Sequence, residues 1–262
     1  MFEFVNYTAD KLQLFLLVML RASGLFLMAP ILGHKSFPAS AKVGLVIVLS
    51  LILMSTLSNV AIPPVLTFGA LVTVALKELF VGLSIGFLFS LLMIGVQGAG
   101  ELVSYQIGFT MASVVDPQSG GEISVLSTFW MLIATLIFMS LNGHHLLITA
   151  LADSYLVLPP GHVSLDGSVP EMIIGYSAYV FVIALKIAAP VIVTLLLTDV
   201  ALGSLSRLMP TMNVFIVGFG LKVAVGLGIM AMALPVFAFV LEKAVGYLND
   251  ELGHLLMAMG KA

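Results

Sequence analysis

Charged side chains within hydrophobic stretches are the residues of this sequence most able to do chemistry, as ion pairs, as a proton relay or as the lining of a water path. A charge at the centre of a membrane helix costs about 2.5–3.5 kcal/mol, so it usually faces the bundle interior, a water path or a partner. For Lys186 we favour a structural interpretation, as a snorkelling or paired charge, and Lys77 beside Glu78 could mark a helix end. The charges of this kind are Arg21, Lys77, Glu78, Glu101, Lys186, Asp199 and Lys222.

The segment 97–108 (QGAGELVSYQIG) carries polar and small residues at the end of a long apolar run. Residues 109–115 are again mostly apolar, and Asp116-Pro117 then breaks the chain. A polar helix end followed by an apolar loop could line or plug a pore, because apolar constrictions gate by excluding water. An ordinary loop after a capped helix explains the spacing equally well. If the segment is helical, one face holds Gln97, Glu101, Ser104 and Gly108.

A second polar pattern lies further along the chain, where Asp199, Gly203 and Arg207 recur every four residues and therefore share one helix face. This spacing favours a structural salt bridge at a membrane boundary. Pro210 is predicted to end this helix, and Asn213 is predicted to cap the next one.

Catalytic and metal-binding patterns are weak in this sequence. His144 and His145 are adjacent and so point to different helix faces, and with Asp153 they match no zinc-binding spacing. We therefore predict interfacial histidines, no metal and no cofactor; an intramembrane hydrolase using these three residues is a distant alternative. No nucleophile motif or phosphate loop supports an enzyme.

The amino-acid composition indicates which kind of structure must position these charged and polar residues. Of 262 residues, 61% are hydrophobic and 9% are charged, against about 25% charged in soluble domains. The net charge of −3, without a basic run, excludes a nucleic-acid partner. We predict an all-α polytopic membrane protein that is surrounded by lipid. The third of its hydrophobic blocks, 66–98, is one long helix or two. The amphipathic tail after Glu242 lies on the membrane or on a partner. The six hydrophobic blocks are 12–32, 43–62, 66–98, 125–141 with a continuation toward 158, 172–197 and 214–241.

Four motifs in order resemble one known family. They are 21–30 (RASGLFLMAP), 98–108 (GAGELVSYQIG), 142–145 (NGHH) and 199–207 (DVALGSLSR). Together they cover almost the whole chain, and they are similar to the signatures of the FliR family of flagellar export-gate proteins. The related family of effector-injection systems looks alike, and the motifs lean toward the flagellar one.

The resemblance implies a structural and gating subunit of the flagellar type III protein-export gate, located in the bacterial inner membrane at the flagellar basal body. Its implied partners are FliP-like and FliQ-like gate proteins, an FlhB-like protein and the unfolded secreted subunits. Residues 1–262 would form a single export-gate domain of kinked helical hairpins, about 1–200 being FliP-like and about 201–262 FliQ-like.

The resemblance also implies roles for individual residues. The region from Gly100 to Asp116 would plug the pore, with Glu101 and Gln106 as polar anchors and Phe109 and Met111 as sealing side chains. The implied plug set is Gly100, Glu101, Gln106, Phe109, Met111, Asp116 and Pro117, and the implied partner-packing set is Arg21, Asp199, Arg207, Asn213 and Lys222. The competing hypothesis is a secondary transporter of a small solute or ion with Glu101, Asp199 and Lys222 as its relay, although no internal repeat is visible.

Overall fold

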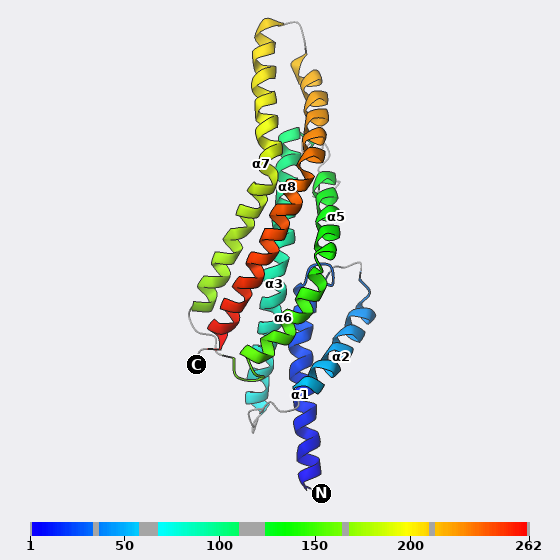
Figure 1. Ribbon diagram of the computed structural model, residues 1–262, viewed down its shortest axis with the longest axis vertical. Coiled ribbons are helices and arrows are strands. Elements are labelled where there is room, and N and C mark those ends of the chain that lie inside the picture. Colours follow the sequence, from blue (N-terminus) through cyan, green and yellow to red (C-terminus); the bar gives the residue numbers. More distant parts are fainter. Residues whose placement is uncertain are drawn as a thin grey trace. The chain divides into compact units, whose positions relative to one another are not determined.

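The computed structural model describes residues 2–33, 37–57, 68–109, 124–163, 168–209 and 213–260, and every regular element in these ranges is an α-helix. The prediction of an all-α protein is therefore confirmed (Figure 1). The helices are α1 (Phe2–Met28), α2 (Ala39–Thr56), α3 (Phe68–Ile107), α5 (Val125–Ser140), α6 (Gly143–Val157), α7 (Ser168–Leu208) and α8 (Val214–Met259).

Length and hydropathy make most of these helices candidates for membrane spans. Within the described ranges five helices are long and apolar enough to cross a membrane, or up to six if the bent pair α5–α6 is one span. The helices α3, α7 and α8 have 40, 41 and 46 residues. At about 1.5 Å per residue each is roughly twice as long as a bilayer core of about 30 Å is thick.

The third hydrophobic block forms one long helix. Helix α3 continues without a break through Lys77 and Glu78, so the suggestion that this pair marks a helix end is wrong. The helix ends thirty residues later, where Gly108 adopts a φ of 102° that only glycine reaches easily, and its N–H bonds to the carbonyl of Ser104.

The turn between α5 and α6 has a comparable local cause. Asn142 adopts a left-handed conformation with a φ of 55°, which asparagine tolerates better than most residues. The two helices are bent by 61° at this point. The single block predicted from 125 toward 158 is therefore a broken helix pair.

Two compact units make up the fold, and each draws on separate parts of the chain. Unit 1 comprises Met1–Leu91, Asn142–Ser177 and Val245–Ala262, and it holds α1, α2, α6, the first half of α3, the start of α7 and the C-terminal end of α8. Helix α2 packs on α1. The core of unit 1 contains side chains that are at most 1% exposed, among them Leu17, Val18, Leu25, Val81, Ile85, Leu88, Leu147, Leu151, Leu248 and Leu255.

The C-terminal tail belongs to the core of unit 1. Helix α8 continues unbroken to Met259, and Leu248, Leu252 and Leu255 are buried against their own chain. The prediction that this tail lies on the membrane surface or on a partner is therefore wrong. The leucines of the amphipathic side fill an intramolecular contact instead.

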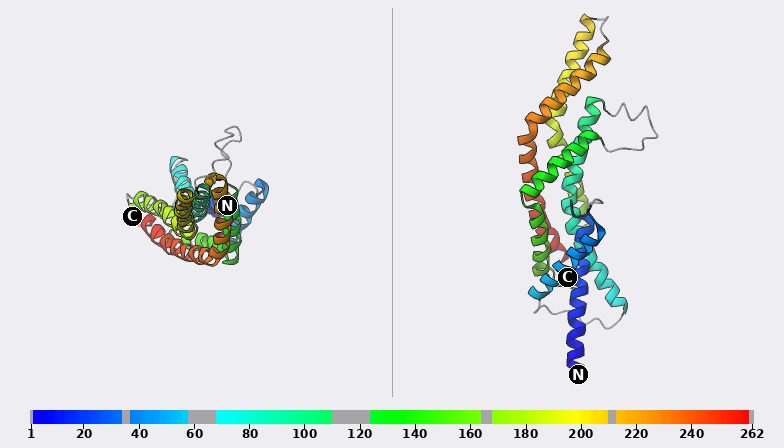
Figure 2. Two further views of the ribbon diagram at one scale, coloured as in Figure 1. Left: turned by 90° about the horizontal axis from the view of Figure 1, so that it is seen from above. Right: turned by 90° about the vertical axis from the view of Figure 1, so that its right-hand side faces the viewer.

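Unit 2 comprises Leu92–Leu141 and Ala178–Ala244 and holds α5, the second half of α3 and most of α7 and α8. The yellow end of α7 and the orange start of α8 lie side by side as a long hairpin (Figure 2). Trp130 of α5 meets Phe237 of α8 edge to face, with 4.9 Å between the ring centroids. Buried aliphatic side chains complete the core, including Val96, Val103, Ile187, Val191, Leu195 and Leu241.

Candidate functional site

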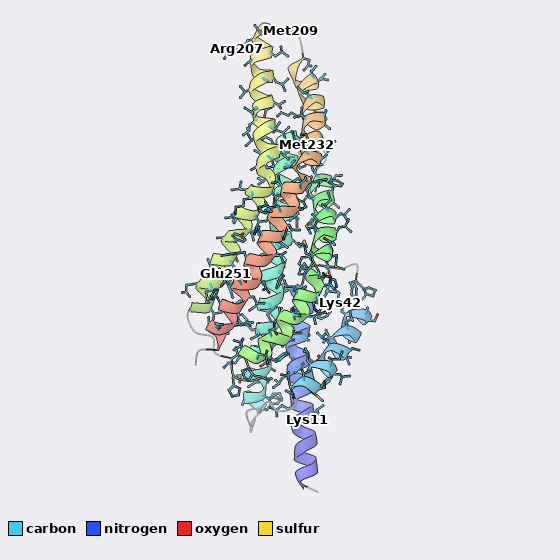
Figure 3. All side chains as sticks on the ribbon, in the orientation of Figure 1. Lys11, Lys42, Arg207, Met209, Met232 and Glu251 are labelled. Atoms are coloured by element: carbon cyan, nitrogen blue, oxygen red, sulfur yellow. The ribbon has the colours of Figure 1, made fainter. Side chains whose placement is uncertain are left out.

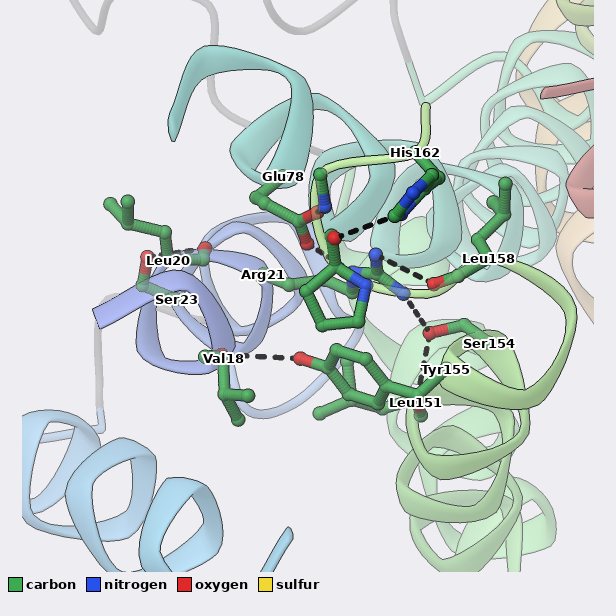
Figure 4. A network of polar contacts seen from close by, with 12 residues as sticks. Val18, Leu20, Arg21, Ser23, Glu78, Leu151, Ser154, Tyr155, Leu158 and His162 are labelled. Carbon is green, nitrogen blue, oxygen red and sulfur yellow. Dashed lines mark hydrogen bonds and ion pairs between the residues drawn. The ribbon is translucent and has the colours of Figure 1, made fainter. Parts of the chain in front are cut away.

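Unit 1 encloses a complete ionic network whose centre is the Arg21 guanidinium of α1 (Figure 4). Its Nε donates to Glu78 Oε2 of α3 at 2.7 Å, and both side chains are fully buried. Its other nitrogens donate to Ser154 Oγ at 3.0 Å and to the carbonyl of Leu158 at 3.1 Å. The second Glu78 oxygen accepts the N–H of Gly161 at 2.8 Å. Each charge is thus paired and further hydrogen-bonded, which a buried ion pair requires.

Tyr155 of α6 adds two more contacts to this network. The Arg21 guanidinium lies 4.2 Å from the centroid of the Tyr155 ring, within the range of a cation–π contact. The Tyr155 hydroxyl donates to the carbonyl of Val18 at 3.3 Å. Through these contacts one arginine joins α1, α3, α6 and the segment that follows α6. The sequence spacing does not identify Glu78 as the partner of Arg21. The two residues do carry opposite charges within apolar blocks.

The helices α1 and α3 approach each other closely enough to place this ion pair. A Cβ added at Gly24 would lie 2.5 Å from the carbonyl oxygen of Leu79, and one at Gly82 would overlap the carbonyl oxygen of Arg21. One turn further on, a Cβ at Gly86 would lie 2.7 Å from the carbonyl oxygen of Leu25. Small residues at four-residue spacing allow this backbone contact, as in other membrane helix pairs.

Unit 2 holds a second polar cluster at the C-terminal end of α3. Gln106 donates through Nε2 to Asp199 Oδ2 of α7 at 3.0 Å. Lys222 of α8 pairs with the other Asp199 oxygen and also reaches the backbone carbonyl of Gln106, at 3.5 Å. The side chains of Lys222 and Asp199 are 22% and 37% exposed. The salt bridge predicted for the Asp199 helix therefore exists, but its cation is Lys222 and not Arg207.

The polar face predicted on segment 97–108 is present in α3. Gln97 donates to Glu101 Oε1 at 3.1 Å, and Ser127 of α5 donates to the carbonyl of Gln97 at 2.9 Å. Gly100 is buried, because a Cβ there would lie 2.5 Å from the Cα of Ser127. Ser124 donates to Ser104 at 2.6 Å. This face of α3 therefore contacts the start of α5, while the Glu101 side chain is exposed.

The residues expected to plug a pore are described only in part. Phe109 directly follows α3 and meets Phe219 of α8 edge to face, with 6.0 Å between the ring centroids. Met111, Asp116 and Pro117 lie outside the described residues. The structure thus describes the segment from Gly100 to Phe109 and its attachment to the α7–α8 hairpin.

The two remaining partner-packing residues lie near the tip of that hairpin. Arg207 is exposed in the last turn of α7, and Figure 3 labels it beside Met209 at the helix end. Asn213 precedes α8, and its Oδ1 accepts the N–H of Ile216 at 3.4 Å, so the predicted N-cap is confirmed with a long hydrogen bond.

The histidine pair lies at the start of α6, where His144 is half-buried and His145 is exposed. Among the described residues, no three His, Asp or Glu side chains gather in a group that could hold a metal ion.

Long apolar helices, two of them joined by a fully buried ion pair, define the class of this protein, a polytopic helical membrane protein. The family described as bacterial export proteins, family 1, matches residues 12–247. The flagellar biosynthetic protein FliR of Bacillus subtilis is 32% identical over 265 residues, covering 98% of this chain and 99% of that protein. FliR of Escherichia coli is 33% identical over 94% of this chain and 92% of its own length, and FliR of Aquifex aeolicus is 33% identical over 82% of each.

The chain therefore belongs to the FliR family of bacterial export proteins and is a component of the flagellar type III export gate. The resemblance found from the four sequence motifs is confirmed. Membership of this family indicates a structural export component rather than an enzyme.

Proposed function

We propose that this chain is the structural and gating subunit that helps to close the export pore, through which unfolded flagellar subunits cross the bacterial inner membrane at the flagellar basal body. In this proposal it catalyses no reaction. It assembles with FliP-like and FliQ-like gate proteins and with an FlhB-like protein. Its part up to about residue 200 takes the place of a FliP-like subunit, and the part from about 201 takes the place of a FliQ-like one.

The anchored end of α3 is the observation that carries this proposal. A segment that seals a pore needs a fixed root, since a loosely held plug would leave gaps. Gln106 is held by Asp199, its carbonyl is approached by Lys222, and Phe109 packs on Phe219. These contacts join the end of α3 and Phe109 to both arms of the α7–α8 hairpin. We propose that the plug runs from Gly100 through Met111 to Asp116 and Pro117, with this anchored end of α3 as its root.

Partner packing is proposed for the exposed residues of the same hairpin. Asp199 and Lys222 are only half-buried by their own chain, and Arg207 and Asn213 are exposed. Large apolar side chains of both arms are also exposed, among them Leu197, Val200, Leu208, Ile216 and Phe219. Arg21 differs from this set, because its charged group is satisfied within its own chain. We propose that it supports partner packing indirectly, by holding α1, α3 and α6 together.

Shortening the plug tests the proposal. Deleting residues 108–115 should open a permanent leak for ions and small molecules in the assembled gate, because the apolar side chains that exclude water are gone. The measurement is single-channel conductance of the purified complex in planar bilayers. An assembled complex that stays as tight as the wild type would remove the plug assignment.

A replacement variant controls for chain length. Exchanging residues 108–115 for glycine and serine keeps the connection but removes the bulky side chains, so it should leak as well. The same exchange in residues 164–167, between α6 and α7, should leave the conductance at the background level. Leak in both replacements would point to general disorder of the complex rather than to a plug.

Weakening the anchor should produce a smaller leak. Lys222→Met removes the cation that bridges Asp199 and the Gln106 carbonyl. A half-exposed pair is worth about 1 kcal/mol or less, so the ratio of open to closed gates should rise up to about fivefold. Lys222→Arg keeps the charge and should stay near the wild-type conductance. Equal conductance of both variants and the wild type would show that the ion pair does not hold the plug.

A further inference from the structure

Lys186 differs from the paired charges in the apolar helices. Arg21 pairs with Glu78, and Lys222 pairs with Asp199, each within this chain. Among the described residues the Lys186 ammonium has no hydrogen-bond or ion-pair partner. Its side chain is exposed on α7, a helix that qualifies as a membrane span.

Lys186 is the only charged residue in the long apolar middle of α7. No other charged residue occurs between Glu171 and Asp199, and about 20 Å of helix separates Lys186 from each of them. The four-carbon stem of lysine is much shorter than this distance. A cation in the middle of an apolar stretch needs a counter-charge or a water path.

The exposed face around Lys186 is otherwise apolar. Val182 and Val193 are 40% and 55% exposed, and with Ala189 they share the face of Lys186 at helical spacing. The opposite face is buried in unit 2, where Ala188 and Leu195 are fully buried and a Cβ at Gly98 of α3 would lie 3.6 Å from the Ala184 Cβ. The lysine therefore points away from the contacts that its own helix makes.

Pro190 adds a second polar group at the same place. It lies inside α7 and has no N–H, so it cannot donate to the carbonyl of Lys186 four residues earlier. The Lys186 ammonium and a backbone carbonyl that lacks its helical hydrogen bond thus occur together on a surface of valine and alanine. In lipid such polar backbone groups are satisfied by neighbouring helices.

We propose that this face of α7, formed by Val182, Lys186, Ala189 and Val193, docks a membrane helix of another subunit that presents a carboxylate to Lys186. Charge complementarity selects this occupant, since a purely apolar helix or a lipid tail would leave the ammonium unpaired. The small side chain of Ala189 lets the partner helix approach. The inference rests on the proposed role as a subunit of a membrane assembly and names the chemistry of one contact.

Carbodiimide coupling tests the contact in the intact complex, purified through a tag on this chain. Dicyclohexylcarbodiimide activates a carboxyl group buried in a membrane, and an adjacent lysine amine then displaces the urea to form an isopeptide bond. We expect a cross-linked peptide that joins Lys186 to an Asp or Glu of a different subunit, identified by mass spectrometry. A bond to an acid of this same chain, or no bond from Lys186, would overturn the proposal.

Matched variants separate the effect of the positive charge at position 186 from the reactivity of the lysine amine. Lys186→Arg keeps the cation but forms no isopeptide bond, so the complex should assemble and the cross-link should vanish. Lys186→Met leaves the partner carboxylate unpaired and should lower the yield of complex at least tenfold. Normal yield of the Lys186→Met complex, or rapid labelling of Lys186→Cys by a membrane-impermeant maleimide, would contradict the proposal in favour of a lipid-facing or water-facing lysine.

Failure of the Lys186 contact can be distinguished from failure of the proposed function. If other membrane proteins copurify with the chain but no isopeptide bond forms, only the Lys186 contact is wrong. If no membrane protein copurifies with the wild-type chain, the role as a gate subunit is itself wrong.

Discussion

Replacing Glu78 by alanine should destabilise the chain by about 3–5 kcal/mol, because it leaves a fully buried guanidinium without its counter-charge. The substitution also removes the acceptor of the Gly161 N–H, so the segment after α6 loses this hydrogen bond to α3. Most of the marginal stability of a folded protein would be lost. The measurement is the temperature at which half of the detergent-solubilised full-length chain leaves the monodisperse peak in size-exclusion chromatography.

An apolar double variant separates the charge from the packing. Replacing Arg21 by methionine together with Glu78 by leucine removes both charges and keeps most of the volume, so much of the stability should return. Arg21→Met alone should be as harmful as Glu78→Ala, since it leaves an unpaired buried carboxylate. If the double variant is no more stable than either single one, the ion pair is not the main contribution of these residues.

Adding one methyl group at Gly82 should have the second-largest effect. The Cβ of Gly82→Ala would overlap the carbonyl oxygen of Arg21, and the neighbouring atoms are also backbone. Backbone cannot rotate out of the way, so α1 and α3 must separate, and Arg21 then moves away from Glu78, which lies one helical turn before Gly82. We expect a loss of about 3 kcal/mol, at the upper end of overpacking effects, in the same chromatographic assay.

Gly175→Ala is the matched control for this substitution. Gly175 also lies within a helix of unit 1, but a Cβ there meets nothing within 4 Å. Alanine favours the helix by up to about 1 kcal/mol over glycine, so this variant should be as stable as the wild type or more so. Equal tolerance of both alanines would mean that the close approach of α1 and α3 is not required.

The sequence by itself determined the class and the family of this protein. An excess of apolar residues and a scarcity of charges leave no soluble alternative, because polar surface is lacking whatever the fold. The places of the helices follow from the apolar blocks, although α3, α7 and α8 extend beyond theirs, and the turns at Gly108 and Asn142 follow from residues that tolerate a positive φ. The polar face of α3 was likewise predictable, because helical spacing alone places Gln97 and Glu101 on one side.

Only the tertiary structure decided which charges pair with which. Arg21 and Glu78 are far apart in the chain, and Asp199 bonds to Lys222 of the next helix rather than to Arg207 on its own face. The amphipathic pattern of the tail predicts a side that faces the membrane or a partner, yet the burial of Leu248 and Leu255 depends on helices distant in sequence. The physical reason is that the periodicity of a sequence reflects local geometry, so it identifies a helix and the residues on each of its faces. In an apolar protein, however, every face of a helix can form a contact. Partners are then selected by close backbone approach and by the need to neutralise each buried charge, and both depend on the three-dimensional arrangement.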